Sequence, residues 1–309
     1  MRGMIVVEEV FDCTILGAGP SGLSSSLILG RSRRSVALFD NGTNRNRVTQ
    51  EAHGFLTRDG VKPEEFRNLA LAELEKYPSV HFFKETVLQV TQQTNDQLFK
   101  IVTSKGHEYL AEKIILATGI QENYPGIPEI SQYYGKSLFS CPYCDGWELR
   151  DQPLIVIAEN EETAYHMGKV IQNWSIDLVV ATNGFKIAPH IESDLKKKGI
   201  SVISESIERL VGEEGYLEKV VFASGIEINR TGGFIAPSFY RPNQFAENLG
   251  CELQKNGEIV TDGFNRTSQK SIYVAGEITQ SAPSSLILAA AEGSKAAFAV
   301  NTDLTDERF

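Results

Sequence analysis

A short apolar strand that runs directly into a glycine-rich turn is the feature that most constrains how this 309-residue chain folds. Residues 11–16 read FDCTIL, the turn GAGPSG follows at 17–22, and the small residues after it are typical of a closely packed helix. A second strand at 35–39 then closes on Asp40, whose carboxylate can bond a ribose. This order of strand, turn, helix, strand and acid is the full fingerprint of a βαβ unit that binds a dinucleotide. The sequence therefore predicts an α/β fold that begins with a Rossmann-like three-layer domain.

Each position of the turn has a predicted role in holding the dinucleotide. Gly17 makes the tight turn, Gly19 lets the backbone approach a pyrophosphate, and Gly22 lets the helix pack closely on the strand. Pro20 and Ser21 open the helix whose N-terminal amides would face the phosphates.

Two later segments are predicted to complete the same site. Strands at 113–117 and 271–275 run into the turns ATG and AGE, and a helix is expected from Pro283. Ligands of open α/β sheets bind at the carboxyl ends of the strands. We therefore add to the site Ala117, Thr118, Gly119, Gly276 and Glu277.

A pair of cysteines in the middle of the chain predicts redox chemistry. Cys141 and Cys144 stand in the sequence CPYCDG, and two thiols at this spacing can close into a disulfide that passes electron pairs. Zinc binding and a purely structural disulfide are the alternatives. Zinc is disfavoured because a second pair of ligands is missing: Cys13 and Cys251 each stand alone. Tyr143 and Trp147 flank the pair and could cover a substrate groove or pack into the core.

Composition excludes several classes of partner. The net charge of −10 argues against nucleic acid and against an anionic membrane surface. The opening MRGMIVVEEV does not follow the pattern of a signal or transit peptide, so we expect a cytoplasmic protein. The apolar stretch 283–300 carries Glu292 and Lys295 and is therefore read as a buried helix, not a membrane span.

In the order GAGPSG, ATG, CPYCDG and AGE, nearly the whole chain resembles the low-molecular-weight thioredoxin reductase family. The resemblance implies an FAD-containing homodimer. It also implies a discontinuous FAD domain at 1–119 and 232–309, with a second Rossmann-like domain of the pyridine-nucleotide type inserted at 120–231. The segments HGFLTRDG and CPYCDGWE resemble the branch that contains fungal and bacterial dithiol oxidases.

The resemblance also assigns residues around the flavin. Arg45 and Asn46 are expected to bind FAD, and His53 lies in a loop that the resembled branch places near the flavin. An ordinary loop histidine is an equally good reading of His53. Glu277 stands where the family has an aspartate, so the geometry of the AGE turn is expected to differ while FAD binding is kept.

The inserted domain has the right pattern of strands but the wrong turn for a nucleotide. Strands at 154–157 and 177–181 flank a helix at 161–173, and the turn between the first strand and the helix reads AENEET. Where the family has small residues, this turn has Ala158, Asn160 and Thr163, and it adds the carboxylates of Glu159, Glu161 and Glu162. The basic motif that grips the NADPH 2'-phosphate is replaced by ATNGFK at 181–186. We therefore expect a degenerate site that has lost its nucleotide, with weak NAD(P)H binding as the alternative.

The resemblance implies a relay of electrons between FAD and the dithiol. The family uses the second cysteine, here Cys144, to exchange electrons with the flavin, and the first, Cys141, to attack an external disulfide. Asp145 stands at the position of the family's acid-base residue. If the pair opens a helix, the helix dipole lowers the pKa of a thiol.

Three functions remain open at this stage. The first is a reductase of protein or small-molecule disulfides that takes electrons from a donor other than NADPH, such as ferredoxin or another flavin. The second is a small-molecule dithiol oxidase that passes electrons to oxygen. The third is a non-catalytic flavin redox sensor.

Overall fold

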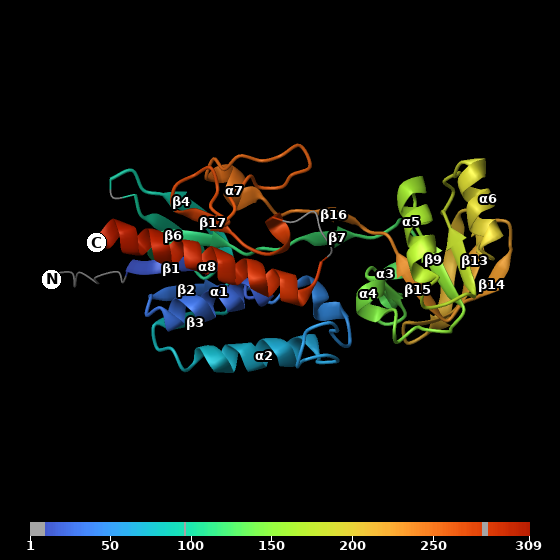
Figure 1. Ribbon diagram of the computed structural model, residues 1–309, viewed down its shortest axis with the longest axis horizontal. Coiled ribbons are helices and arrows are strands. Elements are labelled where there is room, and N and C mark those ends of the chain that lie inside the picture. Colours follow the sequence, from blue (N-terminus) through green and yellow to red (C-terminus); the bar gives the residue numbers. More distant parts are fainter. Residues whose placement is uncertain (1–9, 96, 280–283) are drawn as a thin grey trace. The chain divides into compact units, whose positions relative to one another are not determined.

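The computed structural model describes residues 10–95, 97–279 and 284–309, and these form two compact units (Figure 1). The first comprises the described residues within Met1–Arg47, Glu64–Gln121 and Tyr240–Phe309, and the second comprises Val48–Pro63 and Glu122–Phe239. The predictions for the first nine residues and for Pro283 lie outside the described ranges.

The first unit is built on a seven-stranded sheet with the order β3-β2-β1-β6-β5-β4, in which β17 also pairs with β6. Its strands are β1 (Val10–Leu16), β2 (Val36–Phe39), β3 (Val80–Phe83), β4 (Val87–Gln92), β5 (Phe99–Thr103), β6 (Glu108–Leu116) and β17 (Ile272–Val274). Strand β6 is long enough to pair antiparallel with β5 along its first half and parallel with β17 along its second. The C-terminal segment of the chain therefore completes the sheet that the N-terminal segment begins.

Helices α1 and α8 lie along one face of this sheet (Figure 1). The α-helices and short 3₁₀ helices of this part of the chain are α1 (Pro20–Arg31), η1 (Arg45–Val48), α2 (Pro63–Leu74), α7 (Gln244–Asn248), η2 (Glu277–Thr279) and α8 (Leu286–Arg308). One buried cluster, which includes Ile15, Leu29 and Val300, fills the space beneath α1 and α8. A second cluster, which includes Phe39 and Val274, covers the opposite face. The sheet is thus the middle of three layers, as predicted.

Small residues let α1 and α8 approach each other closely. The Ser25 hydroxyl donates to the carbonyl oxygen of Gly293 at 2.8 Å, and the Ser24 and Ser294 hydroxyl oxygens are 2.8 Å apart. A Cβ atom on Gly293 would lie 2.0 Å from the backbone oxygen of Ser21. Only glycine fits at this position of α8 while the two helices keep this spacing.

The second unit contains a five-stranded parallel sheet with the order β11-β10-β9-β15-β8. Its strands are β8 (Leu138–Phe139), β9 (Leu154–Ile157), β10 (Leu178–Ala181), β11 (Ser201–Ile203) and β15 (Gly232–Ile235). The remaining elements of this part are α3 (Ile130–Tyr133), α4 (Pro142–Asp145), α5 (Glu161–Ile171), α6 (Pro189–Lys197), β12 (Ile207–Glu213), β13 (Tyr216–Phe222) and β14 (Glu227–Asn229). Apolar clusters cover both faces of the sheet. The second βαβ unit is therefore present where the sequence predicts it.

The boundaries of the units differ from the predicted positions. The chain enters the second unit after Gln121 and leaves it after Phe239, because β15 pairs with β9 and completes the second sheet. The two-stranded ribbon of β7 (Gln121–Asn123) and β16 (Ser238–Tyr240) forms at these two crossing points. The segment 48–63 also belongs to the second unit, although the sequence boundaries had assigned it to the first.

None of the helices in the described part of the chain combines the length and the apolar character that a membrane crossing requires. The longest, α8, carries charged side chains at Glu292 and Lys295, as the sequence suggested.

Replacing Gly293 by alanine should destabilise the first unit. The higher helix propensity of alanine favours the substitution by about 1 kcal/mol, but the new methyl group meets a backbone oxygen that cannot rotate away. We expect a net loss of about 1–3 kcal/mol in the free energy of unfolding. Denaturation of Gly293→Ala by urea tests this. Gly126→Ala is the control, since a Cβ there meets nothing within 4 Å. Equal midpoints for the two variants would show that α1 and α8 are not tightly held.

Candidate active site

Backbone contacts explain two of the three glycines in the first turn. Gly17 has a φ of +108°, and a Cβ on it would lie 2.4 Å from the carbonyl oxygen of Ala117. A Cβ on Gly22 would lie 1.8 Å from the carbonyl oxygen of Gly17. Gly19 is different, because a Cβ there would meet nothing within 4 Å. Packing inside the protein therefore does not require glycine at position 19. The open space favours the role predicted for Gly19, which is to let the backbone approach a pyrophosphate, and this role stays a prediction.

Asp40 holds the turn in place from the end of β2. Its carboxylate is largely buried and accepts hydrogen bonds from the backbone N–H groups of Ala18, at 3.1 Å, and Gly42, at 3.0 Å. It also forms an ion pair with Arg67 on α2, a partner that no motif in the sequence indicated. The predicted bond from Asp40 to a ribose would share this carboxylate with the existing contacts.

The ATG and AGE turns meet the first turn at the ends of neighbouring strands. Gly119 and Gly276 both have positive φ values, and a Cβ on Gly276 would lie 2.7 Å from the hydroxyl oxygen of Ser21. The Thr118 hydroxyl is buried and has no hydrogen-bond partner among the described residues. A buried hydroxyl without a partner, beside an open glycine turn, fits a polar ligand such as FAD. Pro20 is the first residue of α1, so the N-terminal amides of that helix face the same turn.

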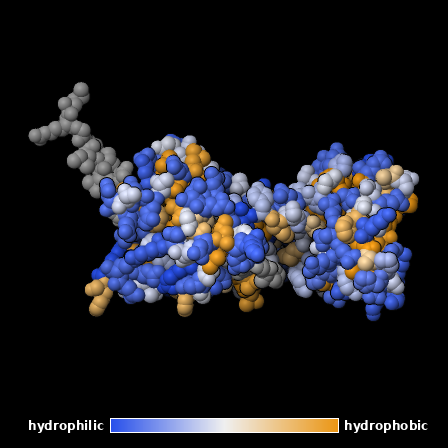
Figure 2. Space-filling view, turned by 90° about the horizontal axis from the view of Figure 1, so that it is seen from above, coloured by the Kyte–Doolittle hydropathy of each residue, from blue (hydrophilic) through white to orange (hydrophobic). Residues whose placement is uncertain are grey.

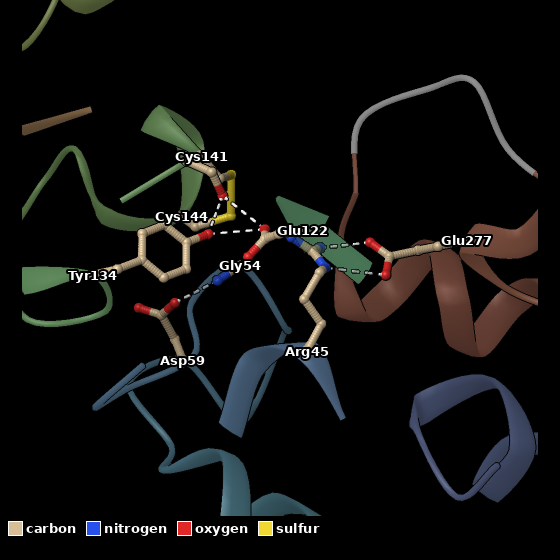
Figure 3. Close-up of a disulfide and its surroundings, with 9 residues drawn as sticks. Arg45, Gly54, Asp59, Glu122, Tyr134, Cys141, Cys144 and Glu277 are labelled. Atoms are coloured by element: carbon tan, nitrogen blue, oxygen red, sulfur yellow. Dashed lines mark hydrogen bonds and ion pairs between the residues drawn. A yellow bond between two sulfur atoms is a disulfide. The ribbon is translucent and has the colours of Figure 1, made fainter. Parts of the chain in front are cut away.

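Glu277 pairs with Arg45 within the first unit (Figure 3). Arg45 Nη2 donates to Glu277 Oε1 at 2.6 Å, and Arg45 Nε donates to Oε2 at 3.4 Å. The neighbouring Asn46 accepts a hydrogen bond from the Asn44 side chain at 2.7 Å. The longer acid in the AGE turn is thus engaged by a second residue predicted to bind the cofactor, and the roles of all three toward FAD stay predictions.

Cys141 and Cys144 form a disulfide in the second unit, with their Cα atoms 5.3 Å apart. Cys141 caps α4, and its carbonyl oxygen accepts from the backbone N–H of Cys144 at 3.1 Å. The pair therefore opens a helix, as considered from the sequence, and because α4 is a single turn of four residues its effect on a thiol pKa stays a prediction. The free thiols of Cys13 and Cys251 are buried, and burial raises the pKa of both.

Asp145 is positioned to hold a proton near neutral pH. Burial, reinforced by the negative charge of Glu148, raises the pKa of Asp145 to about 7. A carboxyl group with such a pKa can act as an acid or as a base at physiological pH. Tyr143 and Trp147, on either side of Asp145 in sequence, are 74% and 65% exposed, so they are not core residues.

On the face shown in Figure 2, hydrophobic residues appear as separate patches on a mainly hydrophilic surface.

Three polar side chains anchor the chain just before the disulfide (Figure 3). The Tyr134 hydroxyl donates to Glu122 Oε1 at 2.8 Å and lies 2.8 Å from the Ser140 hydroxyl oxygen. Ser140 directly precedes Cys141 and lies 3.4 Å from the same oxygen of Glu122. Nothing in the sequence signalled this group, because Glu122 and Tyr134 belong to no recognisable motif.

His53 lies in the segment 48–63, which the structure assigns to the unit that carries the dithiol. Its side chain is 15% exposed and is surrounded by the carboxylates of Glu51, Asp59 and Glu148 at 3.6–3.7 Å. No group of three or more His, Cys, Asp or Glu side chains within the described ranges is arranged to hold a metal ion.

The turn of the second βαβ unit is occupied by its own side chains. Asn160 caps α5 by accepting a hydrogen bond from the backbone N–H of Thr163 at 2.9 Å. Glu161 accepts from the backbone N–H of Ala188 at 2.5 Å, and Glu159 accepts from the Asn183 side chain at 2.7 Å. The cap by Asn160 uses an N-terminal amide of α5 that a phosphate would otherwise find free, and the two other bonds hold carboxylates at the turn.

The fold and the site define a flavin-dependent disulfide oxidoreductase. The chain belongs to the pyridine nucleotide-disulphide oxidoreductase family, whose model matches residues 11–293. The structure of a putative thioredoxin reductase TrxB from Bacillus anthracis is 61% identical, with a TM-score of 0.94 and coverage of 97% of this chain and 100% of that one. HlmI is 31% identical, with a TM-score of 0.91 and coverage of 97% and 94%. A probable thioredoxin reductase of Arthroderma benhamiae is 28% identical over 97% of this chain and 82% of its own length.

These likenesses confirm four predictions from the sequence: the family, the two Rossmann-like domains, the enzyme class and FAD as cofactor. The protein is an FAD-dependent disulfide oxidoreductase of the thioredoxin reductase type.

Substitutions at Gly19 and Gly22 should separate the binding of FAD from the stability of the fold. Gly19→Ala should leave the unfolding midpoint unchanged and weaken FAD binding by about tenfold or more, because the methyl group occupies space kept for the pyrophosphate. Gly22→Ala should lower both, because its Cβ meets the Gly17 carbonyl oxygen. Titration of the deflavinated variants with FAD, followed by flavin fluorescence, measures this. Unchanged affinity in Gly19→Ala would remove Gly19 from the site.

Proposed function

We propose that the protein relays electron pairs between FAD and the Cys141–Cys144 disulfide without drawing them from NADPH. Bound FAD supplies the capacity to accept or give two electrons. The residues of the chain hold the dithiol, select the external disulfide or dithiol substrate and move the protons. We further propose that the protein is a cytoplasmic homodimer and that a reduced protein such as ferredoxin, or another flavin, is the electron donor.

The occupied turn of the second unit is the observation that carries this proposal. A diphosphate placed there would face the carboxylates of Glu159 and Glu161, which are already held by Asn183 and Ala188. Two like charges about 5 Å apart repel by roughly 1–3 kcal/mol at an effective dielectric constant of 20 or more. Binding would also have to displace Asn160 from its cap on Thr163 N–H, which costs about 1 kcal/mol. Together these terms favour a site without a dinucleotide.

Thiol–disulfide exchange at the dithiol balances as follows. The Cys141 thiolate attacks one sulfur of the external disulfide, and the first substrate thiol leaves and takes a proton from Asp145. The Asp145 carboxylate left by this step takes the proton of the Cys144 thiol, and the Cys144 thiolate attacks the Cys141 sulfur. The second substrate thiol leaves and takes that proton back from Asp145. The protein dithiol is thereby oxidised to a disulfide, and the substrate disulfide is reduced to two thiols.

The same relay in the opposite direction is the second candidate function. Because the occupied turn removes the usual reductant, a dithiol substrate could supply the electrons, and oxygen would then be the acceptor. Such a protein would be a small-molecule dithiol oxidase. Anaerobic addition of a dithiol distinguishes the two, since an oxidase reduces its flavin with the dithiol and is reoxidised when oxygen is admitted.

NADPH should reduce the flavin very slowly or not at all. We expect a rate at least a hundredfold below about 10 s⁻¹, an ordinary enzyme turnover, even at millimolar NADPH. Stopped-flow absorbance measures this rate, and dithionite serves as the positive control for a competent flavin. A triple variant that combines Ala158→Gly, Glu159→Ala and Asn160→Gly should regain NADPH binding only in part. The segment ATNGFK at 181–186 would still lack arginines for the 2'-phosphate. Reduction of the wild type by NADPH at about 10 s⁻¹ would overturn the proposal.

The two cysteines should give different spectra when each is replaced. Cys144→Ser should stop electron exchange between flavin and dithiol. Cys141→Ser should instead leave a Cys144 thiolate beside the oxidised flavin and produce a long-wavelength absorption band. Absorption spectra between pH 6 and 9 measure this, with Cys251→Ser as the control because that thiol is free and buried. Identical spectra for the first two variants would show that their roles are wrongly assigned.

A further inference from the structure

His53 is held within the dithiol-bearing unit by charges on two sides. Its Nδ1 atom lies 3.6 Å from Asp59 Oδ1, and its Nε2 atom lies 3.6 Å from Glu51 Oε2 and 3.7 Å from Glu148 Oε1. Glu51 and Asp59 belong to the same loop as His53, whereas Glu148 follows the CPYCDG motif. The His53 ring therefore contacts a carboxylate of the dithiol segment as well as two carboxylates of its own loop.

The loop that carries His53 is anchored independently of these charges. Its first residue, Val48, packs closely on Gly135. A Cβ atom on Gly135 would lie 2.4 Å from the carbonyl oxygen of Val48. Gln50 donates to the Tyr216 hydroxyl at 3.1 Å, and Ala52 and Val61 pair across the base of the loop. Asp59 accepts from the backbone N–H of Gly54 at 2.8 Å and is fixed inside the loop (Figure 3). The position of the loop that carries His53 is thus set by packing and hydrogen bonds.

Glu148 connects this loop to Asp145, which lies three residues before it. Glu148 is the charged neighbour that acts on Asp145, and together with burial it brings the pKa of Asp145 to about 7. Two other charged groups, Arg150 of the dithiol segment and Glu122 near Ser140, have other partners. Arg150 lies over the Trp147 ring at 4.1 Å, and the Glu122 carboxylate accepts from Tyr134.

We propose that Glu148 and His53 form a coupled charge pair that controls proton delivery by Asp145 to the substrate thiol. Both are positioning residues, because they act on the substrate through Asp145. The inference deepens the proposed relay and rests on it. Glu148 as a carboxylate favours the protonated form of Asp145, and the contact with His53 holds the Glu148 carboxylate toward the loop and weakens that effect.

The direction of the effect follows from the charges. Asp145 must carry its proton to protonate a leaving thiolate, so the step slows as the pH rises above about 7. Glu148→Gln removes the like charge and should move this fall in rate to lower pH by about half to one unit. Above neutral pH the variant should therefore be about three- to tenfold slower. Because the side chain of Glu148 is 40% exposed, added salt should reduce the difference between wild type and variant.

The experiment follows flavin reoxidation in the dithionite-reduced holoprotein, mixed anaerobically with two disulfides over a range of pH. Bis(hydroxyethyl) disulfide has an alkyl thiol as its leaving group and needs a proton, whereas dithiobis(nitrobenzoate) releases a stable aryl thiolate without one. Glu148→Gln should shift the pH profile for the alkyl disulfide alone, and Glu148→Asp should restore it. Glu208→Gln, a charge removal elsewhere on the unit, should match the wild type.

His53 is tested in both backgrounds. His53→Asn should shift the profile to higher pH in the wild type and have no effect in Glu148→Gln, since the coupling passes through Glu148. An equal shift in both backgrounds, an unshifted profile in Glu148→Gln, or a shift for both disulfides would overturn the inference while leaving the relay intact. A wild type that reduces neither disulfide would overturn the relay and this inference together.

Discussion

The close backbone contacts around the first glycine turn are the constraint on which the flavin-binding unit depends. The Gly17 carbonyl occupies the place of a side chain on Gly22, and the Ala117 carbonyl occupies that of Gly17. Strands β1 and β6 and helix α1 can therefore meet only where no Cβ intervenes. The same helix then receives Gly293 of α8 and Gly276 of the AGE turn against Ser21. Segments from both ends of the chain are in this way gathered around one turn.

The two βαβ units of the chain have the same architecture but differ in the side chains of their turns. In the first unit the turn keeps free space at Gly19, and the Thr118 hydroxyl lacks a partner among the described residues. In the second unit Asn160 caps its own helix, and Glu159 and Glu161 are bonded to neighbouring turns. The fold is equally well formed in both, because strand pairing and core packing do not depend on the turn. Side chains in the turn decide what the unit can bind.

Charge around the dithiol is organised by contacts between segments that are far apart in sequence. Asp145 is partly buried and directly follows Cys144, and Glu148, which lies 3.7 Å from His53, adds a like charge that raises the pKa of Asp145. Neighbouring charges of this kind shift the pKa of a carboxyl group, and enzymes use such shifts to bring the pKa of a proton donor near neutral pH. Tyr143 and Trp147, which flank Asp145 in sequence, are both exposed.

The sequence by itself determined the fold class, both βαβ units, FAD and the redox dithiol, because glycine spacing and strand periodicity report local backbone geometry directly. Only the tertiary structure decided which distant side chains meet: Arg67 with Asp40, Arg45 with Glu277, and His53 with Glu148. It also decided that β15 completes the second sheet and that the loop 48–63 belongs to the dithiol unit. These pairings depend on how whole elements pack, and a local pattern of residues carries no information about which remote segment will lie against it.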